Sequence, residues 1–244
     1  MLTLAFDTAT EILAVSLGNN GKVICEEGIE AGRSHLEMLL PSIQNLLKGN
    51  NYSLSDIDRI VAGIGPGTFS GLRVGVSTAR ALAQTLEIPL SGFSTLEAMA
   101  LELNRRFAHS GLRKLMPLID AKRGQVFTQF YRIEGEGVIA PESDVLCLDP
   151  VSLVGRVGVI AQEKVGAGGN GAIPYRDAFA GSNLLELLPV EDEGNRVHAG
   201  WLLHKPGSHL DQDVNNLRNL VPMYVREPDA DKTILLRKKE PWLK

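Results

Sequence analysis

Residues 2–17, LTLAFDTATEILAVSL, decide the fold. Two apolar runs flank the polar turn that begins at Asp7, and the turn-forming sequence Gly18-Asn19-Asn20-Gly21 separates the second run from another at 22–26. Short apolar runs divided by such turns are typical of adjacent antiparallel strands. The chain is therefore expected to open as an antiparallel meander, with Asp7 at the end of its first strand.

A weaker copy of this pattern appears 113 residues later. The apolar run at 115–119 ends at Asp120, which falls on Asp7 in the first copy, and an alternating run follows at 125–131. A twofold repeat of strands followed by helices is the simplest account. We predict an α/β protein with two similar lobes, each a mixed sheet flanked by helices. The predicted lobes are residues 1–108 and 109–244.

The turn at Asp7 has two interpretations. A strand ending in Asp-Thr-Ala-Thr fits the hairpin with which actin-like and sugar-kinase-like ATPases hold nucleotide phosphates, where hydroxyls such as those of Thr8 and Thr10 face the phosphates. In the structural interpretation Asp7 caps the turn, and the threonines bond to their own backbone. The turn after Asp120 lacks paired hydroxyls, so it supports phosphate binding less well. Both interpretations remain open.

A second candidate site is the loop GPGTFSGLR, residues 65–73, which follows an apolar strand at 59–64 and opens a helix expected over 70–86. A helix N-terminus is suited to anion binding. The candidate residues in this loop are Gly65, Gly67 and Thr68. The P-loop motif fails, because leucine and arginine follow the last glycine in place of lysine and a hydroxyl residue. Glycines that only shape the corner explain the loop at least as well.

The helix expected over 70–86 has apolar or small residues on two sides. One side is suited to the core, and the second is suited to close approach by another helix. The second stripe consists of Val74, Thr78, Ala81 and Thr85. Together with a leucine-rich helix over 33–48, in which Met38 lies off the main stripe, this side could form a partner surface. A helix sandwiched within one domain explains it equally well.

Composition and charge narrow the function classes. With 44% hydrophobic and 22% charged residues, the chain is typical of a globular protein. Its net charge of −4, with no basic stripe before Arg237-Lys238-Lys239, argues against a protein that binds nucleic acid by itself. Cys25 and Cys147 lack partners at metal-binding spacing and fit reduced thiols in the cytoplasm. No leader or membrane span is expected.

Metal-dependent and covalent catalysis find no support in the residue pattern. His35 is followed four residues later by Leu39 rather than by a second histidine, and the spacing of the other histidines does not pair them on one helical face. No G-x-S-x-G elbow occurs, and neither cysteine stands in an activating context. We therefore predict no metal site and no catalytic residue.

Five motifs, in order along nearly the whole chain, resemble the bacterial TsaB family, also called YeaZ. They are Asp7-Thr8-Ala9-Thr10, Arg33-Ser34-His35-Leu36-Glu37-Met38-Leu39-Leu40-Pro41, GPGTFSGLRVGVSTARALAQ at 65–84, Ile119-Asp120-Ala121-Lys122-Arg123-Gly124 and Pro222-Met223-Tyr224-Val225-Arg226. The glycine motif is the specific one, although the family's loop is closer to GPGSFTGLR, so Thr68 and Ser70 are exchanged here. Leu36 stands where the family often has serine, and 180–220 matches little.

The resemblance implies a two-lobed actin-like ATPase fold, of the ASKHA or ribonuclease H-like kind. It also implies a cytoplasmic, non-catalytic subunit required for threonylcarbamoyl transfer to adenosine 37 of ANN-decoding tRNAs, which is t6A formation. Such a subunit binds and activates the catalytic paralogue TsaD, joins the ATPase TsaE in a larger complex, and contacts tRNA mainly through that complex. A homodimer is expected for the free chain. No tightly bound cofactor is expected, and ATP with Mg would bind only in the assembled complex.

The resemblance places the partner interface on the helices at 33–48 and 70–86. The implied contacts are His35, Leu36, Met38, Leu39, Arg73, Val74, Thr78, Ala81 and Thr85. It leaves a vestigial nucleotide-type site at Asp7, Thr8, Thr10, Gly65, Gly67, Thr68 and Asp120. The alternative function is an actin-fold ATPase or small-molecule kinase that uses Asp7 and Asp120 around Mg-ATP. A metallopeptidase would need a metal site that the sequence does not offer.

Overall fold

The first lobe begins with the predicted meander. In the computed structural model, which describes residues 1–203, 210–212 and 220–225, β1 pairs antiparallel with β2, and β2 with β3. On the other side of β1, β4 runs parallel to β1 and β5 runs parallel to β4, which gives the order β5-β4-β1-β2-β3. The elements of this lobe are β1 (Leu2–Asp7), β2 (Ile12–Asn19), β3 (Lys22–Glu30), α1 (His35–Gly49), η1 (Leu54–Asp56), β4 (Arg59–Gly65), α2 (Phe69–Leu86), β5 (Leu90–Ser94) and α3 (Thr95–Arg106).

The second sheet repeats this order. Its path β12-β11-β6-β7-β10 matches β5-β4-β1-β2-β3, with β6–β7 antiparallel and β11 parallel to β6, while β8 and β9 form an added hairpin. The elements are β6 (Lys114–Lys122), β7 (Gln125–Thr128), β8 (Tyr131–Gly135), β9 (Val138–Pro141), β10 (Leu146–Leu148), α4 (Pro150–Ile160), β11 (Val165–Gly168), α5 (Arg176–Ala180) and β12 (Leu185–Leu187). The duplicated mixed sheet of the predicted actin-like fold is therefore confirmed.

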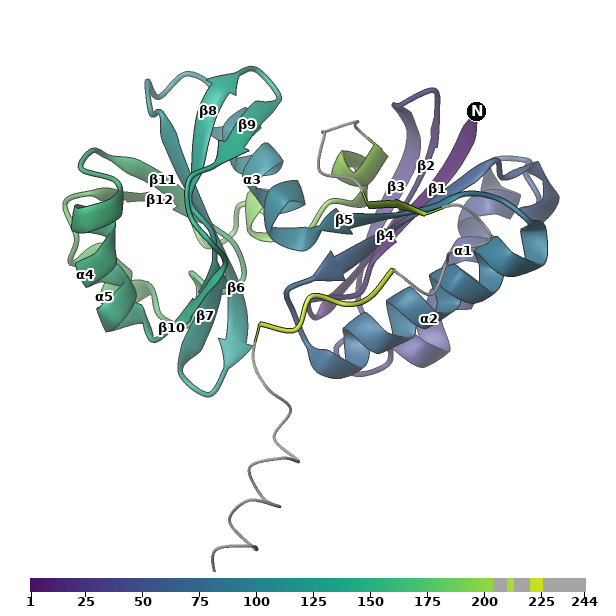
Figure 1. Ribbon diagram of the computed structural model, residues 1–244, viewed down its shortest axis with the longest axis horizontal. Helices are drawn as coiled ribbons and strands as arrows, with labels where there is room; N and C mark the ends of the chain where they lie inside the picture. The colour runs from purple at the N-terminus through teal and green to yellow at the C-terminus, as the bar shows by residue number, and fades with distance from the viewer. Residues whose placement is uncertain (204–209, 213–219, 226–244) are drawn as a thin grey trace, which may run out of the picture.

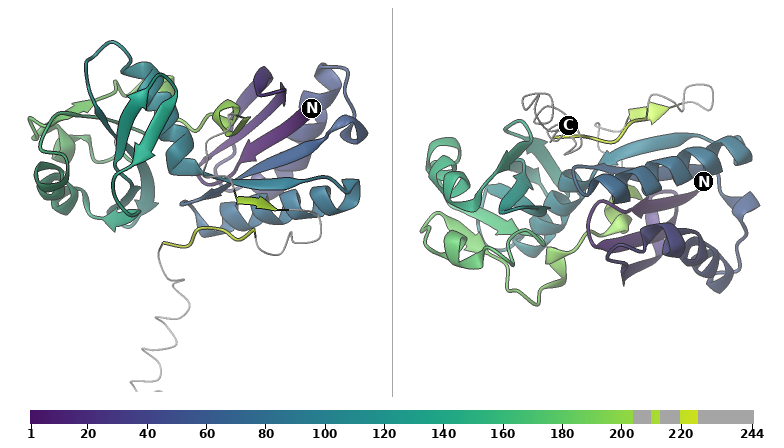
Figure 2. Two further views of the ribbon diagram at one scale, coloured as in Figure 1. Left: turned by 45° about the horizontal axis from the view of Figure 1, so that its top comes forward. Right: turned by 90° about the horizontal axis from the view of Figure 1, so that it is seen from below.

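Helices cover the sheets on faces that the apolar periodicity specifies. In the first lobe α1 and α2 cover one face, and their buried residues, such as Ile43 and Val76, join Phe6 and Leu13 in one core. In the second lobe α4 and α5 cover one face of the sheet, where Leu153 and Phe179 are fully buried. Figures 1 and 2 show α3 between the two sheets, and its apolar residues pack with those of β6.

The end of the described chain returns to the first lobe. The 3-10 turns η2 (Glu193–Asn195) and η3 (Ala199–Leu203) lead back, and β13 (Leu210–Gln212) pairs antiparallel with β5. The backbone N–H of Met223 donates to Ile64 O at 2.7 Å, beside α2 (Figure 1). The predicted division after residue 108 thus separates β1–β5 from β6–β12, but β13 joins the first sheet, because the edge of β5 offers unpaired backbone groups.

Within the described part of the chain, none of the helices combines the length and the apolar character that a membrane span requires.

Candidate functional site

The turn between β1 and β2 packs directly against the start of α2. Thr8 Oγ1 donates to Gly71 O at 2.8 Å, and the N–H of Thr68 donates to Ala9 O at 2.8 Å. A Cβ atom at Gly67 would lie well under 3.0 Å from Ala9 O, and one at Gly71 equally close to Thr8 O. Because only glycine permits such an approach of two backbones, the glycines of this loop serve the packing of the corner.

Asp7 lies beneath this corner and has no exposed surface. Its Oδ1 accepts from the N–H of Ala9 at 2.7 Å, and its Oδ2 accepts from Thr95 Oγ1 at 2.6 Å. Thr95 Oγ1 in turn accepts from the N–H of Gly65 at 3.2 Å. Burial raises the pKa of Asp7, although these two hydrogen bonds lower it. The carboxyl group therefore joins β1, the glycine loop and α3, which favours the structural interpretation of this motif.

The second aspartate differs from Asp7 in its surroundings. Asp120 is partly exposed, and its Oδ2 lies 2.9 Å from Lys122 Nζ, which also contacts Glu11 Oε1 at 2.7 Å. The hydrogen bond to Glu11 is the largest cause of a raised pKa at Lys122, and that to Asp120 adds to it. The two predicted hairpins thus meet through a lysine, a residue whose neighbours the sequence did not indicate. Asp7 and Asp120 do not form an exposed carboxylate pair.

A cavity of about 530 Å³ lies beside these hairpins, between the lobes. Its lining residues are Thr10, Glu11, Ile12, Glu30, Ala31, Gly32, Asn170, Ile173, Val190, Glu191, Asp192, Asn195 and Arg196. Of the predicted nucleotide-type residues only Thr10 lines it, and that hydroxyl accepts from the N–H of Ile12 at 3.2 Å. Four carboxylates and one guanidinium line the cavity, so its field disfavours phosphate groups.

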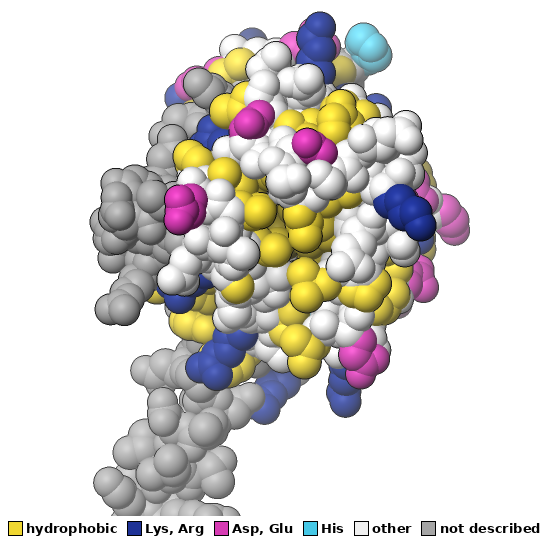
Figure 3. Space-filling model, turned by 90° about the vertical axis from the view of Figure 1, so that its right-hand side faces the viewer, with side chains coloured by type: hydrophobic (Ala, Val, Ile, Leu, Met, Phe, Trp, Pro, Cys, Tyr) yellow, Lys and Arg dark blue, Asp and Glu magenta, His cyan; other side chains and the backbone are white. Residues whose placement is uncertain are grey.

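The second stripe of α2 lies partly at the surface. Ala81 and Thr85 are exposed, and Val74 and Thr78 are half-buried. Of the predicted contacts on α1, Leu36 is 73% exposed, and Met38 is half-buried against the core. Figure 3 faces the end of the molecule that carries α1 and α2, and hydrophobic side chains gather there between charged ones.

Two predicted contacts on α1 are not at this surface. Leu39 is 1% exposed and belongs to the core, because its place on the helix faces the sheet. His35 is 4% exposed at the first turn of α1, and burial lowers the pKa of its imidazole. Both side chains are buried within their own lobe, so the structure gives no support to their predicted role as interface contacts, which stays a prediction.

Arg73, the last predicted contact, is engaged within its own chain. Its guanidinium carbon lies 3.8 Å from the centroid of the Phe69 ring, and its Nε donates to Tyr224 Oη at 3.4 Å. The rings of Phe69 and Tyr224 are 5.2 Å apart between centroids. The sequence motifs contained all three residues, but nothing in their spacing indicated that they meet.

Metal ions in proteins are bound by groups of side chains such as those of His, Cys, Asp and Glu. Within residues 1–203, 210–212 and 220–225, no group of three or more His, Cys, Asp or Glu side chains gathers where it could hold a metal ion.

Comparison with known proteins identifies the family. The family model described as "TsaD: tRNA N6-adenosine threonylcarbamoyltransferase" matches residues 27–176. The chain is 34% identical over 168 residues to the tRNA threonylcarbamoyladenosine biosynthesis protein TsaB of Escherichia coli K12, covering 69% of this chain and 71% of that protein. It is 34% identical over 151 residues to the TsaB protein of Bacillus subtilis 168, covering 61% and 64%.

A solved structure agrees with the sequence relatives. YeaZ from Pseudomonas aeruginosa superposes with a TM-score of 0.70 at 25% identity, covering 92% of this chain and 99% of that one. The motifs, the duplicated sheet and these relatives lead to one assignment. The chain belongs to the TsaB (YeaZ) family of tRNA threonylcarbamoyladenosine biosynthesis proteins.

Proposed function

We propose that this chain serves t6A formation as a non-catalytic subunit that binds and activates its catalytic paralogue TsaD. The observation that carries the proposal is the open side of α2, where Ala81 and Thr85 are exposed although the opposite side is buried in the core. Small side chains allow another helix to approach closely. The exposed side chains of Leu36 and Leu40 on α1, 73% and 46% accessible, supply apolar area beside it.

We propose a non-catalytic role because of the surroundings of the two hairpins. Asp7 is buried, and both of its oxygens accept hydrogen bonds from the chain. The glycine loop is filled by the backbone of the β1–β2 turn, and the neighbouring cavity carries mostly carboxylates. These features argue against the alternative of an ATPase or kinase that uses Asp7 and Asp120 around Mg-ATP.

The assembly would extend beyond one partner. In this proposal TsaE joins the pair in a larger complex, tRNA is contacted mainly through that complex, and ATP with Mg binds only after assembly. The same open face of α1 and α2 would pair two copies when TsaD is absent, because a self-complementary patch favours a twofold dimer.

Replacing Ala81 by glutamate tests the docking face. A buried, unpaired carboxylate costs several kcal/mol, so we expect binding to purified TsaD to weaken by at least about 100-fold in titration calorimetry. Ala180→Glu is the matched control, since Ala180 is exposed on α5 at the far end of the second lobe (Figure 1). Undiminished binding by Ala81→Glu would place Ala81 outside the interface.

Activity measurements test the rest of the proposal. We expect TsaD to modify tRNA in vitro only when this chain is present, and we expect no heat of binding when ATP is titrated into the isolated chain. Full modification by TsaD alone would refute the accessory role. Saturable ATP binding by the isolated chain would favour the ATPase alternative.

A further inference from the structure

We propose that Phe69, Arg73 and Tyr224 form a platform on which an unpaired base of RNA stacks. The three residues, here called the aromatic cluster, come from the first turn of α2 and from the segment 220–225. The proposal goes beyond docking to a paralogue and stands without it, because RNA binding can be measured on this chain alone.

The two rings of the aromatic cluster are exposed to solvent. The side chains of Phe69 and Tyr224 are 39% and 46% accessible, and among the residues that the structure describes the other aromatic side chains are buried or half-buried. The two exposed rings are neighbours, with centroids 5.2 Å apart and planes inclined by 38°. Exposed aromatic rings that gather at one point indicate a binding surface rather than a fold requirement.

Arg73 contacts both aromatic residues of the cluster. Its guanidinium carbon lies 3.8 Å from the centroid of the Phe69 ring, and its Nε donates to Tyr224 Oη at 3.4 Å. The cluster thus combines planar surfaces with a fixed positive charge. Unpaired RNA bases stack on aromatic rings and on arginine planes, and phosphates are attracted to the charge.

Phe69 and Arg73 lie on a different side of α2 from the second stripe. Phe69, Arg73 and Arg80 recur at four and seven residues on one side of α2, where Arg80 also bonds to Leu220 O. Val74, Thr78, Ala81 and Thr85 lie on another side of the helix. A protein seated on that second stripe would therefore leave the aromatic cluster accessible.

The sequence that follows the aromatic cluster differs in net charge from the rest of the chain. After Val225 the chain continues with residues 226–244, which hold six Lys or Arg and four Asp or Glu residues, as well as Trp242. The remainder of the chain is acidic, and the whole chain carries −4. The sequence 226–244 thus has a net charge of +2, with five of its six basic residues at 232–244, and this charge favours a polyanion over a basic protein surface.

Fluorescence anisotropy with a labelled single-stranded oligoadenylate, using the full chain, tests the proposal. Stacking depends on a π face, so we expect Tyr224→Phe to bind within about twofold of the unmodified chain and Tyr224→Leu to bind about tenfold more weakly. Phe69→Leu should lose a similar amount of RNA affinity. Because Phe69 belongs to α2, this second variant does not alter the segment 220–225 itself. Duplex RNA should bind more weakly than the single strand, because its bases are already stacked.

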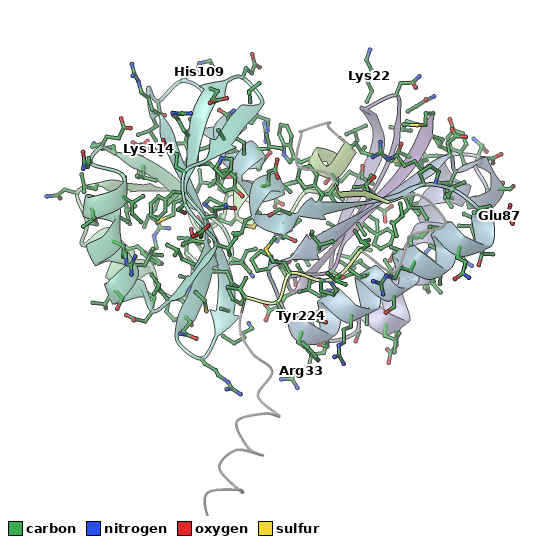
Figure 4. The ribbon with its side chains drawn as sticks, in the orientation of Figure 1. Lys22, Arg33, Glu87, His109, Lys114 and Tyr224 are labelled. Carbon is green, nitrogen blue, oxygen red and sulfur yellow. The ribbon has the colours of Figure 1, made fainter. Side chains whose placement is uncertain are left out.

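A charge control separates stacking from general electrostatics. Arg73→Gln should weaken binding and reduce the slope of log affinity against log salt concentration by about one. Lys22→Gln removes the same charge on the opposite side of the molecule from Tyr224 (Figure 4) and should leave affinity and slope unchanged.

Several outcomes would overturn the proposal. The first is that the unmodified chain binds no RNA. The second is that Tyr224→Leu and Phe69→Leu bind RNA as tightly as the unmodified chain does. The third is that Tyr224→Phe and Tyr224→Leu lose the same amount of affinity while their melting temperatures stay unchanged. Loss of TsaD binding in these variants with RNA binding intact would assign the cluster to a protein partner instead. Failure of the docking proposal alone, seen with Ala81→Glu, would leave the RNA result unaffected.

Discussion

Asp7 is buried where β1, the glycine loop and α3 meet, and Ala9 and Thr95 donate hydrogen bonds to its two oxygens. A Cβ atom at Gly63 would overlap the carboxyl group of Asp7, so the neighbouring strand is also shaped around it. The same aspartate that suggests nucleotide chemistry in the sequence thus acts as a hydrogen-bond acceptor within the fold. Its surroundings rather than its identity distinguish these roles.

Replacing Asp7 separates the two roles. Asp7→Ala leaves the hydroxyl of Thr95 and the N–H of Ala9 without an acceptor, and we expect it to lower the free energy of unfolding by about 1–3 kcal/mol. Asp7→Asn keeps an acceptor oxygen and should cost less. Urea unfolding measures both changes.

The pH dependence of the Asn variant provides a further check. Burial raises the pKa of Asp7 above its ordinary 3.8, so ionisation of Asp7 opposes folding once the pH rises above that value. The stability difference between the unmodified chain and Asp7→Asn should therefore shrink, or change sign, as the pH rises. An Asn variant that is stable but inactive in tRNA modification with TsaD would contradict the structural role.

At the scale of elements, α2 is the helix on which most of the proposals depend. Its start is fixed by the β1–β2 turn through Gly67 and Gly71, and it ends at Leu86, where Glu87 takes a left-handed conformation with φ of 56° and Pro89 follows. Along its length, one side of α2 packs against the core, a second side contacts the segment 220–225, and a third side is exposed to solvent. The glycines that would weaken an isolated helix are needed here for the approach of the turn.

A pair of glycine replacements tests this account. Gly155 lies inside α4 with no atom within 4 Å of an added Cβ, so Gly155→Ala should raise the free energy of unfolding by up to about 1 kcal/mol through helix propensity. Gly71→Ala makes the same change in α2, but its Cβ would overlap Thr8 O, and we expect a loss of about 1–3 kcal/mol. Equal effects of the two replacements in urea unfolding would contradict the packed corner.

At the scale of the whole molecule, a polar network holds the returning segment between the lobes. Glu102 of α3 is 2% exposed and accepts from Arg105, Arg106 and Trp201 Nε1, the last at 2.9 Å. Burial raises the pKa of Glu102, but these hydrogen bonds outweigh it and hold the pKa at about 2. Nearby, His198 Nδ1 lies 3.6 Å from Glu26 Oε1 of β3.

His198 makes the stability of this arrangement depend on pH. The interaction with Glu26 raises the pKa of His198 above its ordinary 6.5, so its contribution to stability is complete below that value and is lost as the pH rises through the folded-state pKa. His198→Gln should therefore lower the free energy of unfolding by up to about 1 kcal/mol at acidic pH and by less at alkaline pH. His109→Gln, a replacement at an exposed position labelled at the top of the second lobe in Figure 4, is the control. A pH-independent loss would contradict the ion pair.

The sequence by itself determined the parts of the protein that depend on local patterns. Alternating and continuous apolar runs predicted the meander and the second hairpin, and the repeat at Asp120 predicted two lobes, because strand periodicity and turn residues act over a few neighbours. The two-sided composition of α2 likewise indicated a stripe of small residues apart from the side that faces the core. The motifs and their order indicated the family.

Only the tertiary structure decided what those patterns are used for. Thr8 and Gly71, or Phe69 and Tyr224, are far apart in the sequence, and their contact requires β1, α2 and the returning segment to be assembled first. The burial of Leu39, within a predicted interface, depends in the same way on the sheet beneath α1. Local periodicity shows which side of an element is apolar, but the distant segment that covers this side is selected by packing of the whole chain.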